Sequence, residues 1–486
     1  MEDKGESEGD GCEIIELKIM SYHVHLFISA KPILAPNQIV FHIKGYTSRN
    51  IREEFEQRKS PPLHYGHVLI SSQRRAMFLQ MSYKYRGADG EMIRTNTFLL
   101  CPTRNQERKL FELADNCTKM YNEINYKRRQ SYFAGKMNWN TDEEYHKYKK
   151  LIGSATAQQV INKNNEAWKS YFALLKKWKE GELDEKPKPP GYWKDRVLGL
   201  RILKYLVRSD SYRLEKRKLK LPFGLRIMWK GKNKWEGKQG RLEIFYDDLS
   251  GRWYAHMPVE VEPPHQPIGE KRAYLDLGVK CPIVAYVNGE VFGYRGNSLL
   301  ADWWYWTHEI AKYQEILNKN GKKTSKRLRK LYRKRQRRFR DVINKIVKDL
   351  VEKCWRKGVS EIICGDLKGI REGADFGRKC NAMIHNYWSH RYILRRIREI
   401  AEEFGIKVET IDERGTSSIC PRCFSSVVTK RGRLFKCQSC GLEAHRDAIG
   451  AQNIRLVHEG SGGVNNRVVA HPLLLSPPIG AGTRLL

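Results

Sequence analysis

Hydrophobic and polar residues follow different periods in successive parts of this chain, and these periods predict its secondary structure. Residues around Tyr22–Phe27 alternate as in a strand, and a helical pattern begins near Pro36. A further strand ends at Pro102, after which apolar residues recur at helical spacing, and a second helical segment covers residues 154–180. Beyond a Pro/Lys-rich linker, short alternating strands over residues 196–262 are typical of a small β-barrel.

Strands and helices alternate in the second half of the chain, which predicts a mixed α/β core. A strand, a turn and a strand begin near residue 271, and a long helical region covers residues 300–356. The elements expected after it are a strand at 361–367, a helix at 388–404, a strand at 407–413 and a helix at 445–457. The Gly/Pro-rich residues 459–486 are expected to form a flexible tail.

The composition indicates a polyanionic partner. The 486 residues are enough for two to four domains, and 90 Lys and Arg against 55 Asp and Glu leave a formal net charge of +35. No run of about 18 apolar residues predicts a membrane span, and the acidic N-terminus MEDKGESEGDG does not resemble a signal peptide. We therefore expect no membrane partner, and a location in the cytoplasm or on the nucleoid of a prokaryote.

One face of the long helical region is strongly basic. Its apolar residues form a stripe along the helix at Leu328, Leu331, Phe339, Val342, Ile346 and Leu350. The opposite face carries a run of cations at Lys322, Lys323, Lys326, Arg327, Arg329, Lys330, Arg333, Lys334, Arg335, Arg337 and Arg338. A charge run is commonly no more than a solvated face, but charges of one sign over several turns favour contact with a nucleic-acid backbone.

Four of the eleven cysteines stand close together as two CxxC pairs. They are Cys420 and Cys423, followed by Cys437 and Cys440. Two such knuckles can direct four thiolates at one tetrahedral ion, and because no coordination position stays open, the expected Zn²⁺ is structural. Two disulfides or an iron–sulfur cluster are the alternatives, but one tight cluster in a basic chain without a signal peptide favours zinc.

Two aspartates on either side of this cysteine cluster favour a catalytic function. Asp276 lies in the apolar strand sequence AYLDLGVK, where an acid is costly, although a turn or capping aspartate would also fit. Asp447 opens the helix DAIGAQNI and by itself would be an ordinary N-cap. Its importance comes from the pairing with Asp276.

These motifs, in this order, resemble the nuclease half of TnpB and of the compact type V CRISPR effectors. The matching sequences are LDLGVK, the acidic strand, TSSICPRC…CQSC and HRDAIGAQNI, and the upstream FLLCPTRNQ…YNEI and AQQVINKNNEAWKSYF are similar to the family's opening strand and recognition helices. The resemblance implies an RNA-guided DNA endonuclease, with a guide RNA and double-stranded target DNA as partners. It also implies a RuvC-like site with two Mg²⁺ ions, for which Asp276 and Asp447 match the first and last catalytic acids. Arg446 could then steady the scissile phosphate, although a surface arginine would also fit.

The middle acid departs from the family pattern. The usual second-strand sequence is Glu-Asp-Leu, whereas here Gly365 precedes Asp366 and Leu367. We expect Glu413 to supply the third carboxylate, because its strand should lie beside the first one and some members of the family carry such a displaced glutamate. Asp366 is the fallback third acid, although alternation along the strand turns it away from the position of the missing glutamate. A dead site is the remaining possibility.

The first 90 residues resemble a different family. The strand with His23 and His25 is similar to the metal-binding His-x-His of TnpA, the HUH single-strand transposase, and HIKGYTSR matches the helix that follows. No later segment resembles the tyrosine-bearing helix of that family, so the covalent chemistry is missing. We interpret residues 1–90 as a dispensable remnant in which both histidines are ordinary strand residues.

The resemblance implies an α/β multidomain fold with a helical recognition lobe, a wedge-like β-barrel and an RNase H-like RuvC nuclease domain with a zinc-ribbon insertion. The expected boundaries are 1–90 for the remnant, 91–112 and 196–268 for the barrel, 113–195 for the recognition lobe, 269–416 and 443–458 for the nuclease, 417–442 for the ribbon and 459–486 for the tail. Two other functions stay open. One is a guided DNA-binding repressor that has lost cleavage, and the other is an unguided zinc-ribbon protein that binds DNA or assists transposition.

Overall fold

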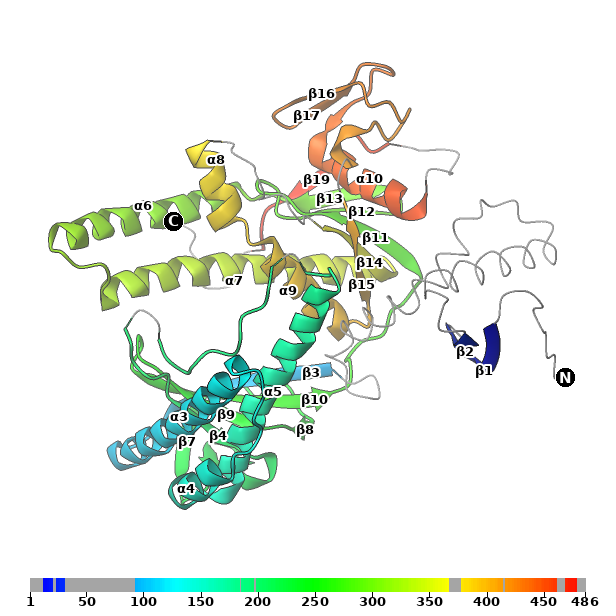
Figure 1. Ribbon diagram of the computed structural model, residues 1–486. Coiled ribbons are helices and arrows are strands. Elements are labelled where there is room, and N and C mark those ends of the chain that lie inside the picture. The colour runs from blue at the N-terminus through cyan, green and yellow to red at the C-terminus, as the bar shows by residue number, and fades with distance from the viewer. Residues whose placement is uncertain are drawn as a thin grey trace. The chain divides into compact units, whose positions relative to one another are not determined.

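The computed structural model describes residues 12–20, 23–30, 92–183, 185–195, 198–366, 377–413, 416–460 and 468–478 (Figure 1). The chain divides into two compact units, Met1–Gly90 and Glu91–Leu486, which are taken separately below. None of the helices in these described segments is both long and apolar enough to cross a membrane.

The first unit contains two described strands. β1 (Cys12–Met20) and β2 (His23–Ala30) pair in antiparallel fashion, with His23 opposite Met20 and His25 opposite Lys18. β2 confirms the strand predicted around Tyr22–Phe27. The helix predicted after Pro36 lies outside the described residues.

An eight-stranded sheet forms the first part of the second unit. Its strands are β3 (Met92–Cys101), β4 (Lys204–Val207), β5 (Arg213–Leu214), β6 (Lys218–Lys220), β7 (Arg226–Lys230), β8 (Lys238–Gln239), β9 (Leu242–Asp247) and β10 (Arg252–Val261). They follow the order β4-β9-β10-β3-β7-β6-β5, with β8 paired to β10. Because the end strands β4 and β5 do not pair with each other in the described residues, the predicted small barrel is present as an open half-barrel.

Three helices share a hydrophobic core with this half-barrel. They are α3 (Arg104–Phe133), α4 (Asp142–Ile152) and α5 (Ser154–Lys179). α3 begins at a capping box, in which Thr103 accepts a hydrogen bond from the backbone of Gln106 and the Gln106 side chain accepts one in return. The helical spacing of apolar residues after Pro102 is therefore a true helix signal, and Leu110, Leu113 and Cys117 of α3 are fully buried.

A six-stranded sheet carries the acidic residues. Its strands are β11 (Lys271–Asp276), β12 (Val284–Val287), β13 (Glu290–Tyr294), β14 (Val359–Asp366), β15 (Lys407–Asp412) and β19 (Leu473–Leu475), in the order β15-β14-β11-β12-β13-β19. β11, β14 and β15 run parallel, whereas β12 is antiparallel to both of its neighbours. The expectation that the strand before Glu413 lies beside the first strand is wrong, because β14 lies between β11 and β15.

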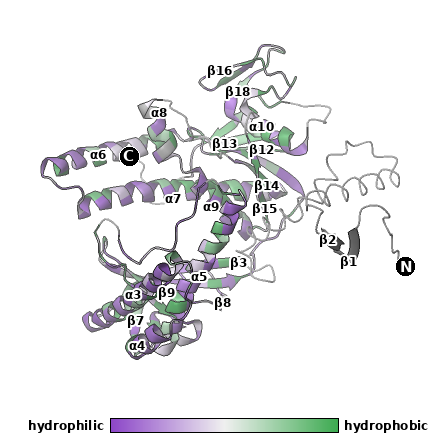
Figure 2. Ribbon diagram, in the orientation of Figure 1, coloured by the Kyte–Doolittle hydropathy of each residue, from purple (hydrophilic) through white to green (hydrophobic). Residues whose placement is uncertain are grey.

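Helices cover both faces of this sheet. On one face lie α6 (Asn297–Lys319), α7 (Lys326–Arg356) and α9 (His390–Glu403), and on the other lies α10 (Arg446–Glu459). The long helical region predicted over 300–356 is in fact two helices, which lie side by side (Figure 1) and are separated at Gly321, where φ is +63°. Both helices alternate between hydrophilic and hydrophobic residues along their length (Figure 2), and the apolar stripe of α7 faces the core through Phe339, Ile346 and Leu350.

The remaining elements are a short helical segment before α9, a separate three-stranded ribbon and a C-terminal strand that pairs with the six-stranded sheet. α8 (Arg378–Ala382) and a π-helical turn (Met383–Tyr387) precede α9, and β16 (Val428–Arg431), β17 (Leu434–Cys437) and β18 (Glu443–His445) form a separate three-stranded sheet. Part of the segment expected to be a flexible tail instead contributes β19, which pairs with β13. Val469 and Gln452 of α10 exchange two hydrogen bonds of 2.8 and 2.9 Å, which link this segment to the helix that carries Asp447.

Candidate active site

Asp276 is the last residue of β11, an interior strand of the six-stranded sheet. Side chains alternate along β11, so Ala273 and Leu275 enter the core beneath α7 and α9, whereas Tyr274 packs on the α10 face. Asp276 shares the face of Tyr274. Burial, followed by the nearby negative charge of Asp447, raises the pKa of Asp276 to about 7.

Helix α10 brings a carboxylate and a glycine against Asp276. Asp447 lies in the first turn and is 7% exposed. It is not an N-cap residue, since His445 holds that position. One turn further along, a Cβ atom at Gly450 would lie only 2.4 Å from Asp276 Oδ2. The side chain of Asp276 therefore approaches α10 through the space that glycine leaves.

The carboxylate of Glu413 lies over Gly365 of the neighbouring strand. Glu413 directly follows β15, which pairs in parallel with β14 so that Gly365 lies opposite Ile411. A Cβ atom at Gly365 would lie 1.8 Å from Glu413 Oε2 and 3.1 Å from Ile454 Cδ1. Glu413 thus fills the space that a side chain at position 365 would need. This is the position of the glutamate in the usual family pattern.

Burial and the other acids of the cluster both raise the pKa of Glu413. Burial is the main reason that its pKa is raised to about 8, and the negative charges of Asp276, Asp366 and Asp412 add to the effect. The cluster therefore combines partly or fully buried carboxylates that repel one another, a state that a bound divalent cation would relieve. Carboxylate oxygens are the hard ligands that Mg²⁺ prefers, so this donor set fits Mg²⁺.

Asp447 is held by a residue of the three-stranded ribbon. Arg433, in the turn between β16 and β17, donates from Nη1 to both carboxylate oxygens of Asp447 at 2.5 and 2.7 Å. The charges of Arg446 and Arg433 lower the pKa of Asp276, against the stronger effects that raise it. Among the described residues, the four cysteines are the group of possible metal ligands whose donor atoms all lie within 4.8 Å of one another. The acids do not converge as tightly as these cysteines.

Asp366, the fallback third acid, ends β14 next to Gly365. It lies opposite Asp412 in the register of β14 and β15. Because neighbouring residues of a strand point to opposite faces, Asp366 does not share the face on which Glu413 covers Gly365.

Arg446 is the first residue of α10, and its backbone N–H donates to the carbonyl of Arg433 at 2.8 Å.

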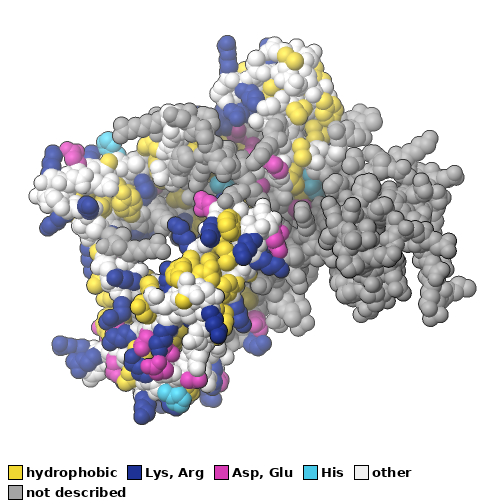
Figure 3. Space-filling model, in the orientation of Figure 1, with side chains coloured by type: hydrophobic (Ala, Val, Ile, Leu, Met, Phe, Trp, Pro, Cys, Tyr) yellow, Lys and Arg dark blue, Asp and Glu magenta, His cyan; other side chains and the backbone are white. Residues whose placement is uncertain are grey.

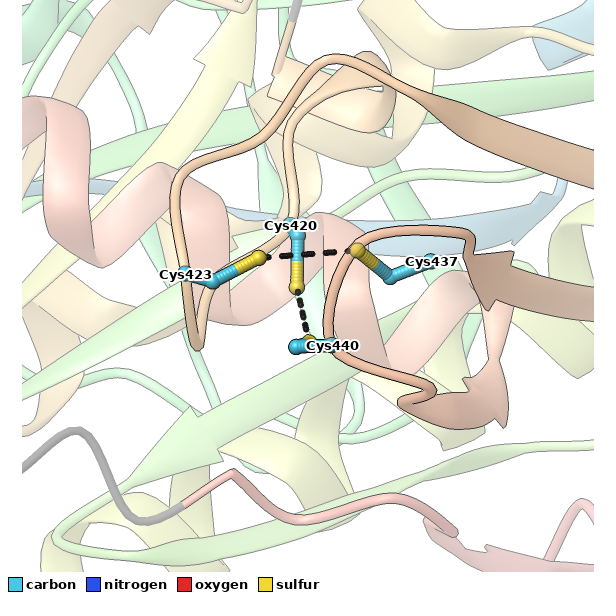
Figure 4. A group of neighbouring side chains, drawn as sticks. All are labelled: Cys420, Cys423, Cys437 and Cys440. Atoms are coloured by element: carbon cyan, nitrogen blue, oxygen red, sulfur yellow. Dashed lines mark hydrogen bonds between the residues drawn. The ribbon is translucent and has the colours of Figure 1, made fainter.

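The four clustered cysteines surround a common centre (Figure 4). The Sγ atoms of Cys420 and Cys440 are 3.6 Å apart and those of Cys423 and Cys437 are 3.5 Å apart, and all four thiols are free of disulfides. Hydrogen bonds from the backbone N–H groups of Cys440 and Ser439 contribute to lowering the pKa of Cys437 to about 6, whereas burial raises the pKa of Cys420 to about 12. The cluster therefore suggests a zinc ion.

Several cations of the predicted basic face are engaged within the protein. Arg329 pairs with Asp248 and Asp195, Arg333 pairs with Asp247, and Arg338 pairs with Asp302. Arg335 donates to Thr307 Oγ1 at 2.8 Å and lies over the ring of Trp303. The exposed cations of the predicted set are Lys322, Lys323, Lys326, Arg327, Lys330, Lys334 and Arg337. Lys and Arg side chains are also spread over much of the face drawn in Figure 3.

Two residues that shape the site were missed by the sequence analysis. Arg433 stands in the sequence RGRLFKC, where it has the same local pattern as any surface cation. Gly450 did carry a usable signal, because a glycine inside a helix costs about 1 kcal/mol relative to alanine. A glycine inside a helix, one turn after Asp447, indicates a close approach by another group.

Three family models match separate parts of the chain. Residues 256–371 match a family described as a probable transposase, and residues 390–454 match the Cas12f1-like TNB domain. Residues 4–79 match the IS200-like transposases, which confirms the predicted likeness of the first 90 residues to a transposase.

Known proteins resemble the chain over different lengths. TnpB-like protein ORF457 of Acidianus two-tailed virus is 34% identical over 402 residues, which cover 74% of this chain and 86% of that protein. The CRISPR-associated endodeoxyribonuclease Cas12f1 of Sulfoacidibacillus thermotolerans is 28% identical over 236 residues, which cover 44% of this chain and 52% of that protein. A solved Cas12f1–sgRNA–target DNA complex superposes with a TM-score of 0.48 at 14% identity, covering 86% of this chain and 95% of the other.

Proposed function

Since the chain belongs to the family of TnpB-like proteins, we propose that it is an RNA-guided endonuclease that cleaves DNA by Mg²⁺-dependent hydrolysis. The related Cas12f1 protein is named as an endodeoxyribonuclease, which supports nuclease activity. Asp276, Glu413 and Asp447 are the proposed catalytic acids, and a guide RNA and double-stranded DNA are the proposed partners.

A single observation carries the proposal of an active site: the carboxylate of Glu413 occupies the space above Gly365. Loss of the usual glutamate would by itself suggest a dead nuclease. A second acid that reaches the same space from the next strand replaces the lost group with one of the same chemistry. The raised pKa values of Asp276 and Glu413 support the same conclusion, because such perturbed carboxyl groups concentrate at functional sites.

The residues of the chain would divide the catalytic work between them. Asp276, Glu413 and Asp447 would hold two Mg²⁺ ions through carboxylate oxygens, and these ions, when bound, activate a water molecule and stabilise the leaving oxygen. Arg446, at the start of α10, would steady the scissile phosphate by its charge. The exposed cations of α7 and of the segment before it would attract the nucleic-acid backbone.

The four cysteines would hold one structural Zn²⁺. All four ligands are protein thiolates, so this ion would have no open position for chemistry. Its role would be to fold the ribbon from which Arg433 reaches Asp447.

Substitution of Glu413 tests the proposal. We expect Glu413→Ala to abolish Mg²⁺-dependent cleavage of guided target DNA while RNA and target binding stay near the wild-type level. Asp276→Ala and Asp447→Ala should behave in the same way. Glu409→Ala is the matched control, because Glu409 is an exposed residue of the same strand, β15.

A relocation variant makes this test sharper. Glu413→Ala empties the space over Gly365, so the double variant Gly365→Glu/Glu413→Ala should regain part of the cleavage by returning the acid to β14. Asp366→Ala should cut at a reduced but measurable rate. If Asp366→Ala is inactive while Glu413→Ala still cuts, the third acid is Asp366.

The two rival functions give different results. Wild-type protein that binds guided target but never cuts, in Mg²⁺ or Mn²⁺, would be a guided DNA-binding repressor. Protein that copurifies with no long stoichiometric RNA would instead be an unguided zinc-ribbon protein.

A further inference from the structure

The displaced glutamate lacks the anchor that a strand residue has. A glutamate at position 365 would lie within β14 and would be held by the strand ladder, in which Gly365 pairs with Ile411 of β15. Glu413 lies one residue beyond the end of β15, where the ladder has stopped. A carboxylate in that position can hold a defined place only if its backbone is fixed in another way.

Thr416 provides the first part of such an anchor. Its backbone N–H and its side-chain hydroxyl both donate to the carbonyl of Glu413, at 3.1 and 2.8 Å. Thr416 is 7% exposed and opens the short 3₁₀ helix Thr416–Ser418. The hydroxyl therefore stays in the protein interior, where water cannot readily replace it as a donor.

Asn453 of α10 provides the second part. Its Nδ2 donates to the carbonyl of Thr416 and, at 2.8 Å, to the carbonyl of Ile419. Asn453 is 3% exposed, so both carbonyls receive a buried amide donor rather than solvent. The amide supplies two N–H donors without placing a charge of either sign beside the acids.

These contacts make α10 the common support of all three acids. It carries Asp447 itself, it receives Asp276 at Gly450, and it holds the backbone of Glu413 through Asn453 and Thr416. Ile454, the next residue, lies beside the space over Gly365 in which the Glu413 carboxylate sits.

We infer that Asn453 and Thr416 are positioning residues that hold Glu413 in place for metal binding. This inference rests on the proposed role of Glu413. They act through the backbone of Glu413 rather than on a metal ion or substrate. In effect, the Asn453–Thr416 chain of hydrogen bonds replaces the strand ladder that would hold a glutamate on β14.

A pair of substitutions at Thr416 isolates the hydroxyl. Thr416→Val has nearly the same shape without the donor, whereas Thr416→Ser keeps the donor. Outer-shell partners of metal ligands typically contribute 10–100-fold to metal affinity, so we expect Thr416→Val to weaken Mn²⁺ binding about 10-fold, measured directly by titration in the absence of DNA. The half-saturating Mg²⁺ concentration for cleavage should rise to a similar extent. Thr416→Ser should stay within about twofold of wild type.

A double-variant cycle separates positioning from general structural damage. In the Glu413→Ala background, Thr416→Val should cause no further loss of Mn²⁺ affinity, because the group that it positions is gone. Asn453→Leu, which removes the amide donors and keeps the branching of the side chain, should follow the same pattern. Equal losses in both backgrounds, or wild-type Mn²⁺ binding by Thr416→Val, would overturn the inference.

The outcomes also distinguish this inference from the proposed function. If Glu413→Ala binds Mn²⁺ and cleaves like wild type, the proposed role of Glu413 has failed. If Glu413→Ala is inactive but Thr416→Val and Asn453→Leu are both unaffected, only the positioning role has failed. Zinc content and guide RNA content, measured on each preparation, report whether a variant is correctly folded.

Discussion

Arg433 and Asp447 form an ion pair in which one guanidinium nitrogen donates to both carboxylate oxygens, at 2.5 and 2.7 Å. This contact joins the cysteine-bearing ribbon to the last of the proposed catalytic acids. Without Arg433, the nearly buried Asp447 would lose its charged donor. A hydrogen bond to a charged group typically contributes about 1.5–3 kcal/mol.

We therefore expect Arg433→Ala to lower the free energy of unfolding by about 1–3 kcal/mol when no Mg²⁺ is added. The loss should shrink at millimolar Mg²⁺, because a cation bound at Asp447 takes over the role of the guanidinium. Thermal unfolding of zinc-loaded protein with and without Mg²⁺ measures both effects. Arg431→Ala, an exposed arginine of the adjacent β16, is the control. An identical loss under both conditions would contradict a shared site.

Gly365 allows a test of the space that Glu413 occupies. Its φ is not in the left-handed region, so alanine is compatible with the backbone, but the added Cβ would meet Glu413 Oε2 at 1.8 Å. Gly365→Ala should therefore fold and bind target, yet cleave at least about 10-fold more slowly because the carboxylate is displaced. Single-turnover cleavage at saturating target measures this. Cleavage at the wild-type rate would show that Glu413 does not need this space.

The cysteine cluster predicts one zinc ion per chain. We expect Cys437→Ser to release it and to unfold the ribbon, because closed thiolate sites contribute folding free energy directly. Elemental analysis of purified protein and protease sensitivity of residues 417–442 are the measurements. Cys380→Ser, which removes an exposed cysteine of α8, should keep its zinc. Wild-type protein without zinc would refute the ribbon assignment.

The first unit is expected to be dispensable. Residues 1–90 form a compact unit of their own, and the sequence that resembles TnpB begins near Met92. Deletion of residues 1–90 should leave guide RNA binding and guided cleavage within about twofold of the full chain, as for removal of an independent domain. Loss of RNA binding by the truncated protein would mean that this unit has been recruited for guide recognition.

Phe424 provides a prediction about the stability of the cysteine cluster that does not depend on catalysis. It follows the first cysteine pair in a left-handed conformation, with φ +59°, where the corresponding residue after the second pair is Gly441. A left-handed conformation costs a residue with a side chain about 1–2 kcal/mol. Since Phe424 is 44% exposed and gives up little packing, Phe424→Gly should retain zinc against a chelator at least as well as wild type. Phe424→Ala keeps the Cβ atom and should not gain in this way.

Much of this protein could be predicted from the sequence because its signals are local. The two CxxC pairs, the helical periodicity after Pro102 and the strand sequence around Asp276 depend on residues close together in the chain. The preference for Glu413 over Asp366 as the proposed third acid rested only in part on a local rule, the alternation of side chains along a strand, which turns Asp366 away. Its other ground, that the strand before Glu413 lies beside the first strand, was wrong because β14 lies between them.

Only the tertiary structure decided features that depend on contacts between distant segments. The register of β14 and β15 brings the carboxylate of Glu413 over Gly365, and a shift by one residue would reverse which side chains face the site. Arg329, Arg333 and Arg338 look like free cations in the sequence, but acids from other elements pair with them. β19 likewise becomes a strand only because β13 offers it an edge. Local periodicity reports how a segment folds, whereas the partner of each side chain is set by chain segments that lie far away in the sequence.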